Sequence, residues 1–374
     1  MRIRHFLPLI AALSLLAPAW SQPGPKKEGS DTVARPRKKG DAPEPERAPI
    51  ESKLKKKGGD ALPEGVPTFK SDSTTVSVDV AVLDNRGRFI PGIPKGNFRI
   101  LEDGAPQQVS QFAMGEAPMT ISLVIEFSNL FQQYWGQGWF ETLTAVYGFV
   151  STLKPEDFVA VVAFDLRPEI LSDFSTDRRK TQEALQRLRI AAFSESNMYD
   201  ALVDTAERMQ EIEGRKAIFY IGSGIDTFSR MTFDECRKRL QAAGVPVYGM
   251  SILQAMREIM DARGAMGPLA RLDFLQADNQ VRTFAKETGG MAYFPRFIGE
   301  YGGIFGSVHN ALRNQYSISY TPTNQSRDGK FRKIKVELVN PATNEPLKVT
   351  DEKGKAVKYQ IVSKIGYTAP REVE

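Results

Sequence analysis

The stretch TISLVIEFSNL, residues Thr120–Leu130, decides the fold. Its first half, Ile121–Ile125, is an uninterrupted run of apolar or small residues, most of them β-branched or leucine. A strand without polar alternation is typical of a parallel sheet that helices cover on both faces. The run stops at Glu126, Ser128 and Asn129, whose oxygen-bearing side chains would lie at the carboxyl edge of that sheet. Because open α/β sheets bind ligands at this edge, the sequence predicts a functional site there.

The chain beyond this stretch alternates between short apolar runs and helical patterns. We predict strands at 157–164, 168–174, 217–222, 245–251 and 291–295. We predict helices at 139–153, 177–189, 197–212, 232–243, 273–287 and 304–315. The segment 254–272 has little regularity and is expected to be an exposed insertion. Strands that alternate with helices predict an α/β fold with a doubly wound, mostly parallel sheet.

Both flanks of this region have the pattern of antiparallel strands with one solvated face. TTVSVDVAVLD and NFRILEDGAPQQVSQFAM carry the pattern before the region, and YSISYTP, FRKIKVELV and KYQIVSKIGYTAP carry it afterwards. Each flank is too small to form a sandwich of sheets alone. We therefore expect residues 71–117 and 316–370 to form one β-rich domain beside an α/β domain at 118–315.

The N-terminus has the features of a secretory signal peptide at residues 1–21. Two arginines precede an apolar run, and the run ends at Ala19-Trp20-Ser21, a small-x-small cleavage pattern. The alternative is a membrane anchor, but that needs about 20 apolar residues. This run is shorter and contains Pro8 and Pro18. We predict an exported protein, either periplasmic, held at the cell surface or extracellular.

Residues 22–70 are predicted to be a disordered linker, because they are rich in proline and charge and poor in aromatic residues. Residues 1–21 carry a charge of +2, and residues 22–68 hold 11 Lys and Arg against 8 Asp and Glu, or +3. These sums equal the net charge of +5, so the remaining chain is neutral and has no basic footprint for nucleic acid. The basic cluster Lys53–Lys57 could contact an anionic envelope surface or simply be solvated.

Several segments in order resemble the von Willebrand factor type A (VWA) family. They include VSVDVAVLDNRGRFI, NFRILEDGAPQQVSQF, LKPEDFVAVVAF, NMYDAL, AIFYIGSGIDTFS, LRNQYSISYTP and IGYTAP. The resemblance covers nearly all of the chain after the linker. The chain resembles more closely a secreted bacterial branch of the family, in which the VWA domain lies between β segments.

The resemblance implies an ion site at the sheet edge. Members of the family typically bind a divalent cation through Asp-x-Ser-x-Ser after the first strand, a Thr on a later loop and an Asp after the fourth strand. An acidic residue of a protein partner completes the coordination. Hard cations such as Mg²⁺ or Mn²⁺ require oxygen ligands of this kind.

This chain departs from that pattern at several positions. Glu126 stands in place of the first Asp, Ser128 matches the first Ser, and Leu130 replaces the second. Ser196 falls at or beside the Thr position, and Ser223 replaces the late Asp, with Asp226 three residues further on. We therefore expect a degenerate site of Glu126, Ser128, Ser196, Ser223 and Asp226 that binds Mg²⁺ or Mn²⁺ weakly or not at all. The ligand-binding edge would comprise Asn129, Asn197 and Asp200.

An enzyme is the main alternative of another class. Ser223 follows a buried strand as a hydrolase nucleophile would, but Ile221 and Ile225 stand where a nucleophile elbow requires glycine. His309 is the only histidine after the signal peptide, and Cys236, the only cysteine, lies in a helical pattern typical of a small buried residue. Classical triads and zinc sites are therefore nearly excluded.

We predict an exported, non-enzymatic interaction module of the adhesion type, with a protein partner and no required cofactor. A structural envelope component without a specific ligand is the remaining alternative.

Overall fold

The computed structural model describes residues 75–115, 117–128, 143, 146–188, 193–264, 267–350 and 356–371. The predicted signal peptide (1–21), the predicted linker (22–70), Asn129 and Leu130 lie outside the described residues.

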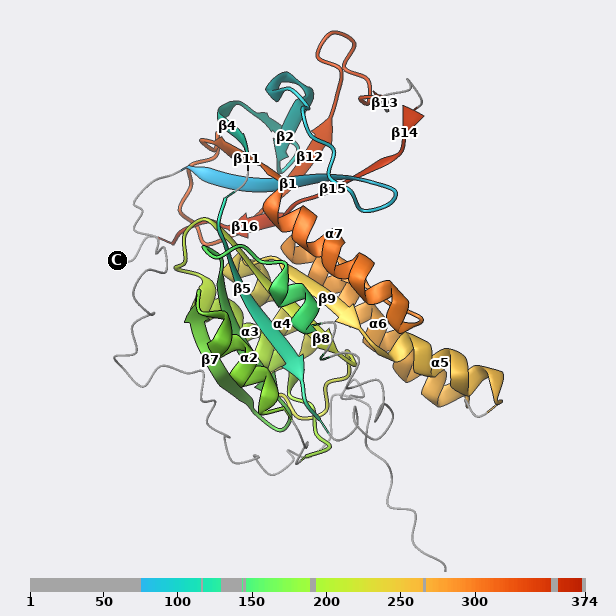
Figure 1. Ribbon diagram of the computed structural model, residues 1–374. Helices are drawn as coiled ribbons and strands as arrows, with labels where there is room; N and C mark the ends of the chain where they lie inside the picture. Colours follow the sequence, from blue (N-terminus) through green and yellow to red (C-terminus); the bar gives the residue numbers. More distant parts are fainter. Residues whose placement is uncertain are drawn as a thin grey trace, which may run out of the picture. The chain divides into compact units, whose positions relative to one another are not determined.

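A six-stranded sheet forms the centre of the α/β part, in the order β10-β9-β8-β5-β6-β7 (Figure 1). Its strands are β5 (Met119–Glu126), β6 (Phe158–Phe164), β7 (Pro168–Ser175), β8 (Arg215–Gly222), β9 (Val247–Ser251) and β10 (Ala292–Tyr293). Every pair is parallel except β6 and β7, so β7 is an antiparallel edge strand. The predicted doubly wound, mostly parallel sheet is confirmed. All eight residues of β5 are buried, as its unbroken apolar run requires.

Helices cover both faces of this sheet. They are α2 (Arg178–Gln186), α3 (Met198–Met209), α4 (Phe233–Ala243), α5 (Leu253–Ala262), α6 (Pro268–Thr288) and α7 (Tyr301–Arg313). Residues from α3, α4 and α6 pack with Val124 and Ile218 on one face. Residues from α2, α7 and the helical segment 146–151 pack with Leu123 and Phe219 on the other. The sheet therefore has two apolar faces, which explains why its central strands show no alternation.

The irregular structure expected at 254–272 is wrong, because α5 and the start of α6 occupy this segment, whereas the expected exposure is found at most of its described residues. Pro268 stands at the first turn of α6, where its missing N–H costs no hydrogen bond, so it begins a helix there. Side chains cap the N-termini of α2 and α4: Asp177 accepts from the Arg179 N–H, and Thr232 forms a capping box with Glu235.

The two flanks share two antiparallel sheets, with strand orders β15-β1-β11-β4 and β16-β12-β2-β3. The strands before the α/β part are β1 (Val76–Asp84), β2 (Phe98–Glu102), β3 (Ala105–Gln107) and β4 (Val109–Gly115). Those after it are β11 (Gln315–Tyr320), β12 (Phe331–Leu338), β15 (Tyr359–Val362) and β16 (Gly366–Thr368); β13 (Val349–Thr350) and β14 (Ala356–Val357) pair with each other. The short 3-10 helices are η1 (Lys95–Asn97) and η2 (Ile298–Glu300).

Alternate residues of these strands form a common core between the two sheets. Val78 and Val80 of β1 pack with Tyr316 of β11 and Ile100 of β2. Such a core needs strands from both flanks, which lie more than 200 residues apart in the sequence. The domain boundaries at 71–117, 118–315 and 316–370 stay a prediction.

Three buried charged residues lie where the chain passes between the flanks and the α/β part. The Arg215 guanidinium donates to the carbonyl oxygens of Gly115 and Gln315, one on each crossing segment, and also to that of Arg313. The Arg313 guanidinium forms an ion pair with Asp157. Asp157 in turn accepts from the N–H of Met119, at the start of β5, at 3.0 Å. Both crossings are thus fixed to the base of the sheet.

We expect Asp157→Asn to destabilise the protein by about 3–5 kcal/mol, because Arg313 would keep a buried charge without its counter-ion. Denaturant unfolding of both forms measures the difference in the free energy of unfolding. The matched control is Asp261→Asn, which breaks an exposed pair with Arg271 and should cost less than about 1 kcal/mol. Equal effects of the two substitutions would contradict the role assigned to Asp157.

Candidate functional site

The side chain of Glu126 ends the central strand β5 and is fully buried. Its Oε1 accepts from the Ser128 hydroxyl at 2.8 Å. Its Oε2 accepts from the Ser223 main-chain N–H at 2.6 Å and from the Ser223 hydroxyl at 2.7 Å. Ser223 follows β8, the neighbour of β5, so the parallel pairing brings the two strand ends together. The structure thus brings Glu126, Ser128 and Ser223 together at the carboxyl edge of the sheet.

Glycines on both sides of Ser223 allow this close approach. A Cβ at Gly222 would lie 2.4 Å from the Tyr220 hydroxyl and 2.7 Å from Glu126 Oε2. Gly224 has φ of +77°, and a Cβ there would lie 2.8 Å from the carbonyl oxygen of Ala277. The sequence Gly222-Ser223-Gly224 therefore allows close packing around a buried carboxyl group.

Burial and hydrogen bonding act in opposite directions on the pKa of the Glu126 carboxyl group, and burial is the larger effect. Burial raises its pKa, while hydrogen bonds from Ser223 and Ser128 and the nearby Ser196 hydroxyl oppose that shift. Ser196 is itself fully buried, and its hydroxyl completes no hydrogen bond of normal geometry with a described residue. Its main chain is held instead by Thr227, whose hydroxyl accepts from the Ser196 N–H at 2.9 Å.

Asp226 lies beside this cluster but serves a different element. Its Oδ1 accepts from the N–H of Tyr199 in the first turn of α3 at 3.1 Å, and its carboxylate is also bound by Ser229. Asn197, the N-cap residue of α3, makes no side-chain cap bond. Asp226 and Ser229 therefore cap α3 from a neighbouring loop. Burial raises the pKa of Asp226 to about 7.

The residues expected to form the ligand-binding edge are already engaged where the structure describes them. Asn197 is buried, donating to the Leu166 carbonyl oxygen at 3.2 Å and accepting from Ser229 at 2.8 Å. Asp200 is buried and accepts from Arg230 at 2.9 Å. Asn129 lies outside the described residues. The exposed part of this edge includes Arg230 instead.

Sequence reasoning missed two members of the site. The Tyr220 hydroxyl interacts with the Glu126 carboxyl group and accepts from the Gly224 N–H at 2.8 Å. The Ser229 hydroxyl lies within hydrogen-bond distance of both Asp226 and Asn197. Tyr220 lies inside an apolar strand pattern, which gives no sign of a polar contact. Ser229 lies in an irregular loop, so only the three-dimensional structure brings it to α3.

The site therefore draws on the ends of β5 and β8 and on the loop before α3. The sheet order, with one antiparallel edge strand and helices on both faces, places these three segments together at the carboxyl edge. The sheet order and the helices on both faces are those of the doubly wound α/β fold that the sequence predicts.

Comparisons with known proteins give structural neighbours only. No protein-family model and no curated protein sequence matches the chain. The VWA domain of the type V pilus tip protein Mfa5 from Porphyromonas gingivalis is similar at 11% identity and a TM-score of 0.40, over 53% of this chain and 97% of that one. A VWA protein from Catenulispora acidiphila is similar at 11% identity and a TM-score of 0.39, over 80% and 76% of the two chains.

Proximal thread matrix protein 1 of the mussel byssus, solved with a zinc-occupied metal site, is similar at 12% identity and a TM-score of 0.42. The match covers 57% of this chain and 50% of that one, so this chain spans about half the length of the mussel protein. Among the described residues, no group of three or more His, Cys, Asp or Glu side chains could hold a metal ion.

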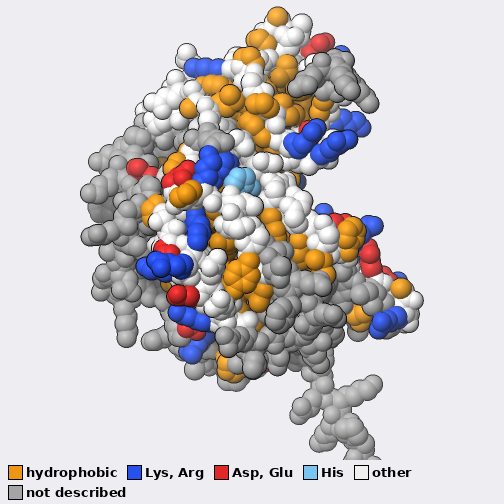
Figure 2. Space-filling view, viewed as in Figure 1, with side chains coloured by type: hydrophobic (Ala, Val, Ile, Leu, Met, Phe, Trp, Pro, Cys, Tyr) orange, Lys and Arg blue, Asp and Glu red, His pale blue; other side chains and the backbone are white. Residues whose placement is uncertain are grey.

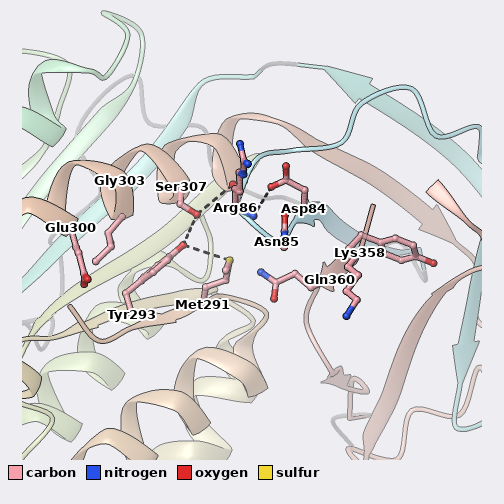
Figure 3. Close-up of a pocket in the computed structure, with 13 residues that line it drawn as sticks. Asp84, Asn85, Arg86, Met291, Tyr293, Glu300, Gly303, Ser307, Lys358 and Gln360 are labelled. Carbon is pink, nitrogen blue, oxygen red and sulfur yellow. Dashed lines mark hydrogen bonds between the residues drawn. The ribbon is translucent and has the colours of Figure 1, made fainter. Parts of the chain in front are cut away.

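A second concave region lies beside α7. Its cavity of about 660 Å³ is bordered by Arg86 and Lys358 on one side and Glu300 on the other (Figure 3). In the space-filling view of Figure 2, a hollow opens on the right side of the molecule, with Lys and Arg side chains above it. Tyr293 points into it and donates to Ser307 at 3.2 Å. Arg86 and Lys358 are exposed, so the charged groups of this hollow are already solvated. It is a weaker candidate than the buried cluster around Glu126 at the carboxyl edge of the six-stranded sheet.

The raised pKa of Asp226 makes the stability depend on pH. The folded state holds this proton more tightly than the unfolded chain, so stability falls as the pH rises from 3.8 to about 7 and then levels off. Asp226→Asn removes this contribution. We therefore expect the free energy of unfolding of the wild type, relative to the variant, to fall over that range. Urea unfolding at pH 5, 6, 7 and 8 measures the difference, and a constant value would contradict the assigned pKa.

Proposed function

We propose that the protein is an exported, non-enzymatic interaction module of the adhesion type that binds a protein partner without a divalent cation. Its ion site is degenerate. The burial and hydrogen bonding of Glu126 support this proposal above all other observations. A carboxyl group that receives the Ser223 N–H and two serine hydroxyls has little accepting capacity left for a cation.

The chemistry of the cluster also argues against cation binding. Metal binding requires deprotonated carboxylates, and burial of Glu126 favours the protonated form. Asp226, the second carboxyl group, is committed to the N-terminus of α3. Ser128 and Ser196 alone would offer neutral oxygen ligands, which balance none of the charge of a Mg²⁺ or Mn²⁺ ion.

The same contacts argue against the hydrolase alternative. The Ser223 hydroxyl donates to Glu126 inside the protein and is fully buried, so it is not presented to a substrate. His309 lies on α7 and accepts from Arg313 at 3.2 Å, which is a structural contact. Cys236 is buried, and burial raises its pKa, which disfavours the reactive thiolate.

Among the described residues no helix is long and apolar enough to cross a membrane. Export rests on the sequence pattern at residues 1–21, and sequencing the N-terminus of the mature protein tests it. We expect that the mature protein begins at Gln22, which would place it in the periplasm, at the cell surface or outside the cell. A mature protein that retains Met1 would contradict export by this route.

Partner capture from the envelope fraction tests the interaction. The full chain serves as bait, in the presence of either MgCl₂ or EDTA. We expect one specific partner, captured equally under both conditions. Loss of capture in EDTA would show that a cation completes the site. The absence of any specific partner would favour a structural envelope component.

A metal-restoring variant tests the degenerate site directly. Addition of Mg²⁺ or Mn²⁺ should stabilise the wild type by no more than about 0.4 kcal/mol, the effect of a millimolar site at about 1 mM ion. Glu126→Asp combined with Ser223→Asp shortens one carboxylate and adds another, as in the family pattern. The melting temperature of this variant should rise when the cation is added and fall again when EDTA removes it.

Without a cation the double variant should be less stable than the wild type, because its two carboxylates repel each other. Glu126→Asp alone is the matched control and should respond weakly to the ion. An EDTA-sensitive melting temperature in the wild type would overturn the proposal.

A further inference from the structure

A cavity of about 840 Å³ lies at the opposite end of the α/β sheet from Glu126. One wall is the polar face of β1 and β11, with Asp79 and Ser317. The other wall is formed by the chain around the start of β8, including Lys216, and by Lys364 between β15 and β16. Two ammonium groups therefore enter one partly enclosed space, and the interaction site proposed above uses neither of them.

Two main-chain carbonyl oxygens hold the Lys216 ammonium group in place, and one of its three N–H donors is not used by them. Its Nζ donates to the carbonyl oxygens of Gln210 at 2.7 Å and Ile212 at 2.8 Å, just beyond the end of α3. An ammonium group has three N–H donors, so one remains for a ligand in the cavity. Positive charge is also favoured at the C-terminus of a helix.

The main chain of Lys364 lies against the end of α6. Gly289 caps α6 with φ of +89°, and a Cβ there would lie 2.3 Å from the Lys364 nitrogen, so only glycine permits this contact. The Lys364 ammonium makes no hydrogen bond or ion pair with any residue that the structure describes. It is partly buried, so water compensates its charge less well than at an open surface.

The charges of the described residues that line the cavity around the two lysines do not balance. Asp79 acts on both ammonium groups, but its Oδ1 already accepts from Ser317 at 2.7 Å. Arg215 also lines the cavity and is engaged with main-chain carbonyl oxygens, while Glu213 lies on the exposed rim. Tyr367 is the remaining titratable residue of the lining. One carboxylate therefore faces two ammonium groups at the centre of the site.

We propose that this cavity binds an oxyanion, a carboxylate or a phosphate, between Lys216 and Lys364. The anion supplies the missing negative charge and accepts the unused donors of both ammonium groups. It binds in a partly desolvated space, where such interactions are stronger than at an open surface. The site does not rest on the proposed interaction function and lies at the other end of the sheet.

The two lysines also make binding depend on pH. Burial and the charge of Lys364 lower the pKa of Lys216 to about 8, and burial lowers the pKa of Lys364. The oxyanion requires the protonated forms, so its affinity is greatest below pH 8 and falls as the pH rises through that value.

Isothermal titration calorimetry with the full chain tests the site, using inorganic phosphate and acetate as separate probes in a chloride buffer. We expect saturable binding of at least one probe at pH 7, weakened about tenfold or more at pH 9.5. Preference for phosphate or for acetate identifies which class of oxyanion the site takes. Saturable binding of neither probe would overturn the proposal.

Three variants separate the site from general effects of charge. Lys364→Met should weaken binding about tenfold or more, and Lys364→Arg should retain it. The matched control is Lys238→Met, which removes the same charge from an exposed position of α4 and should change nothing. Binding by Lys364→Met as tight as that of the wild type would overturn the proposal. The pH dependence of the wild type provides the same decision if that variant does not fold.

Discussion

The Arg215 guanidinium is the contact on which the assembly of the described chain depends. It binds carbonyl oxygens on both segments that connect the β-rich flanks with the α/β part, and Arg313 and Asp157 extend the contact to the start of β5. A buried arginine requires such partners, because an unpaired guanidinium in the interior would be costly. The α/β part is inserted between two halves of a β structure, and Arg215 contacts both of the connecting segments.

The sequence predicted the α/β part well because its signals are local. The apolar run of β5 and the cap at Asp177 each depend on neighbours within a few residues. The region of α5 and α6 was misread because Gly264, Gly267 and Pro268 indicate a break, although the proline begins a helix. Propensity alone does not tell a helix start from a helix stop at such a position.

The candidate site was predictable in outline for the same reason. Strand ends mark Glu126 and Ser223, and parallel pairing brings them together. The sequence did not indicate that the Glu126 carboxyl group is buried and hydrogen-bonded within the protein. Glu126 is one methylene longer than the aspartate of the family pattern, and its oxygens contact Ser128 and Ser223 directly. The roles of Tyr220 and Asp226 depend on contacts between separate loops, which no sequence period records.

The pairing of β1 has a mechanical consequence. Residues 76–80 are hydrogen-bonded to β11 and residues 81–84 to β15, so the strand is held along its whole length. A pull directed along the axis of β1 would load these hydrogen bonds in shear. Bonds loaded in shear share the force and must rupture together, whereas bonds that are peeled apart break one after another. The first strand of the β-rich sheets is therefore suited to bear tension.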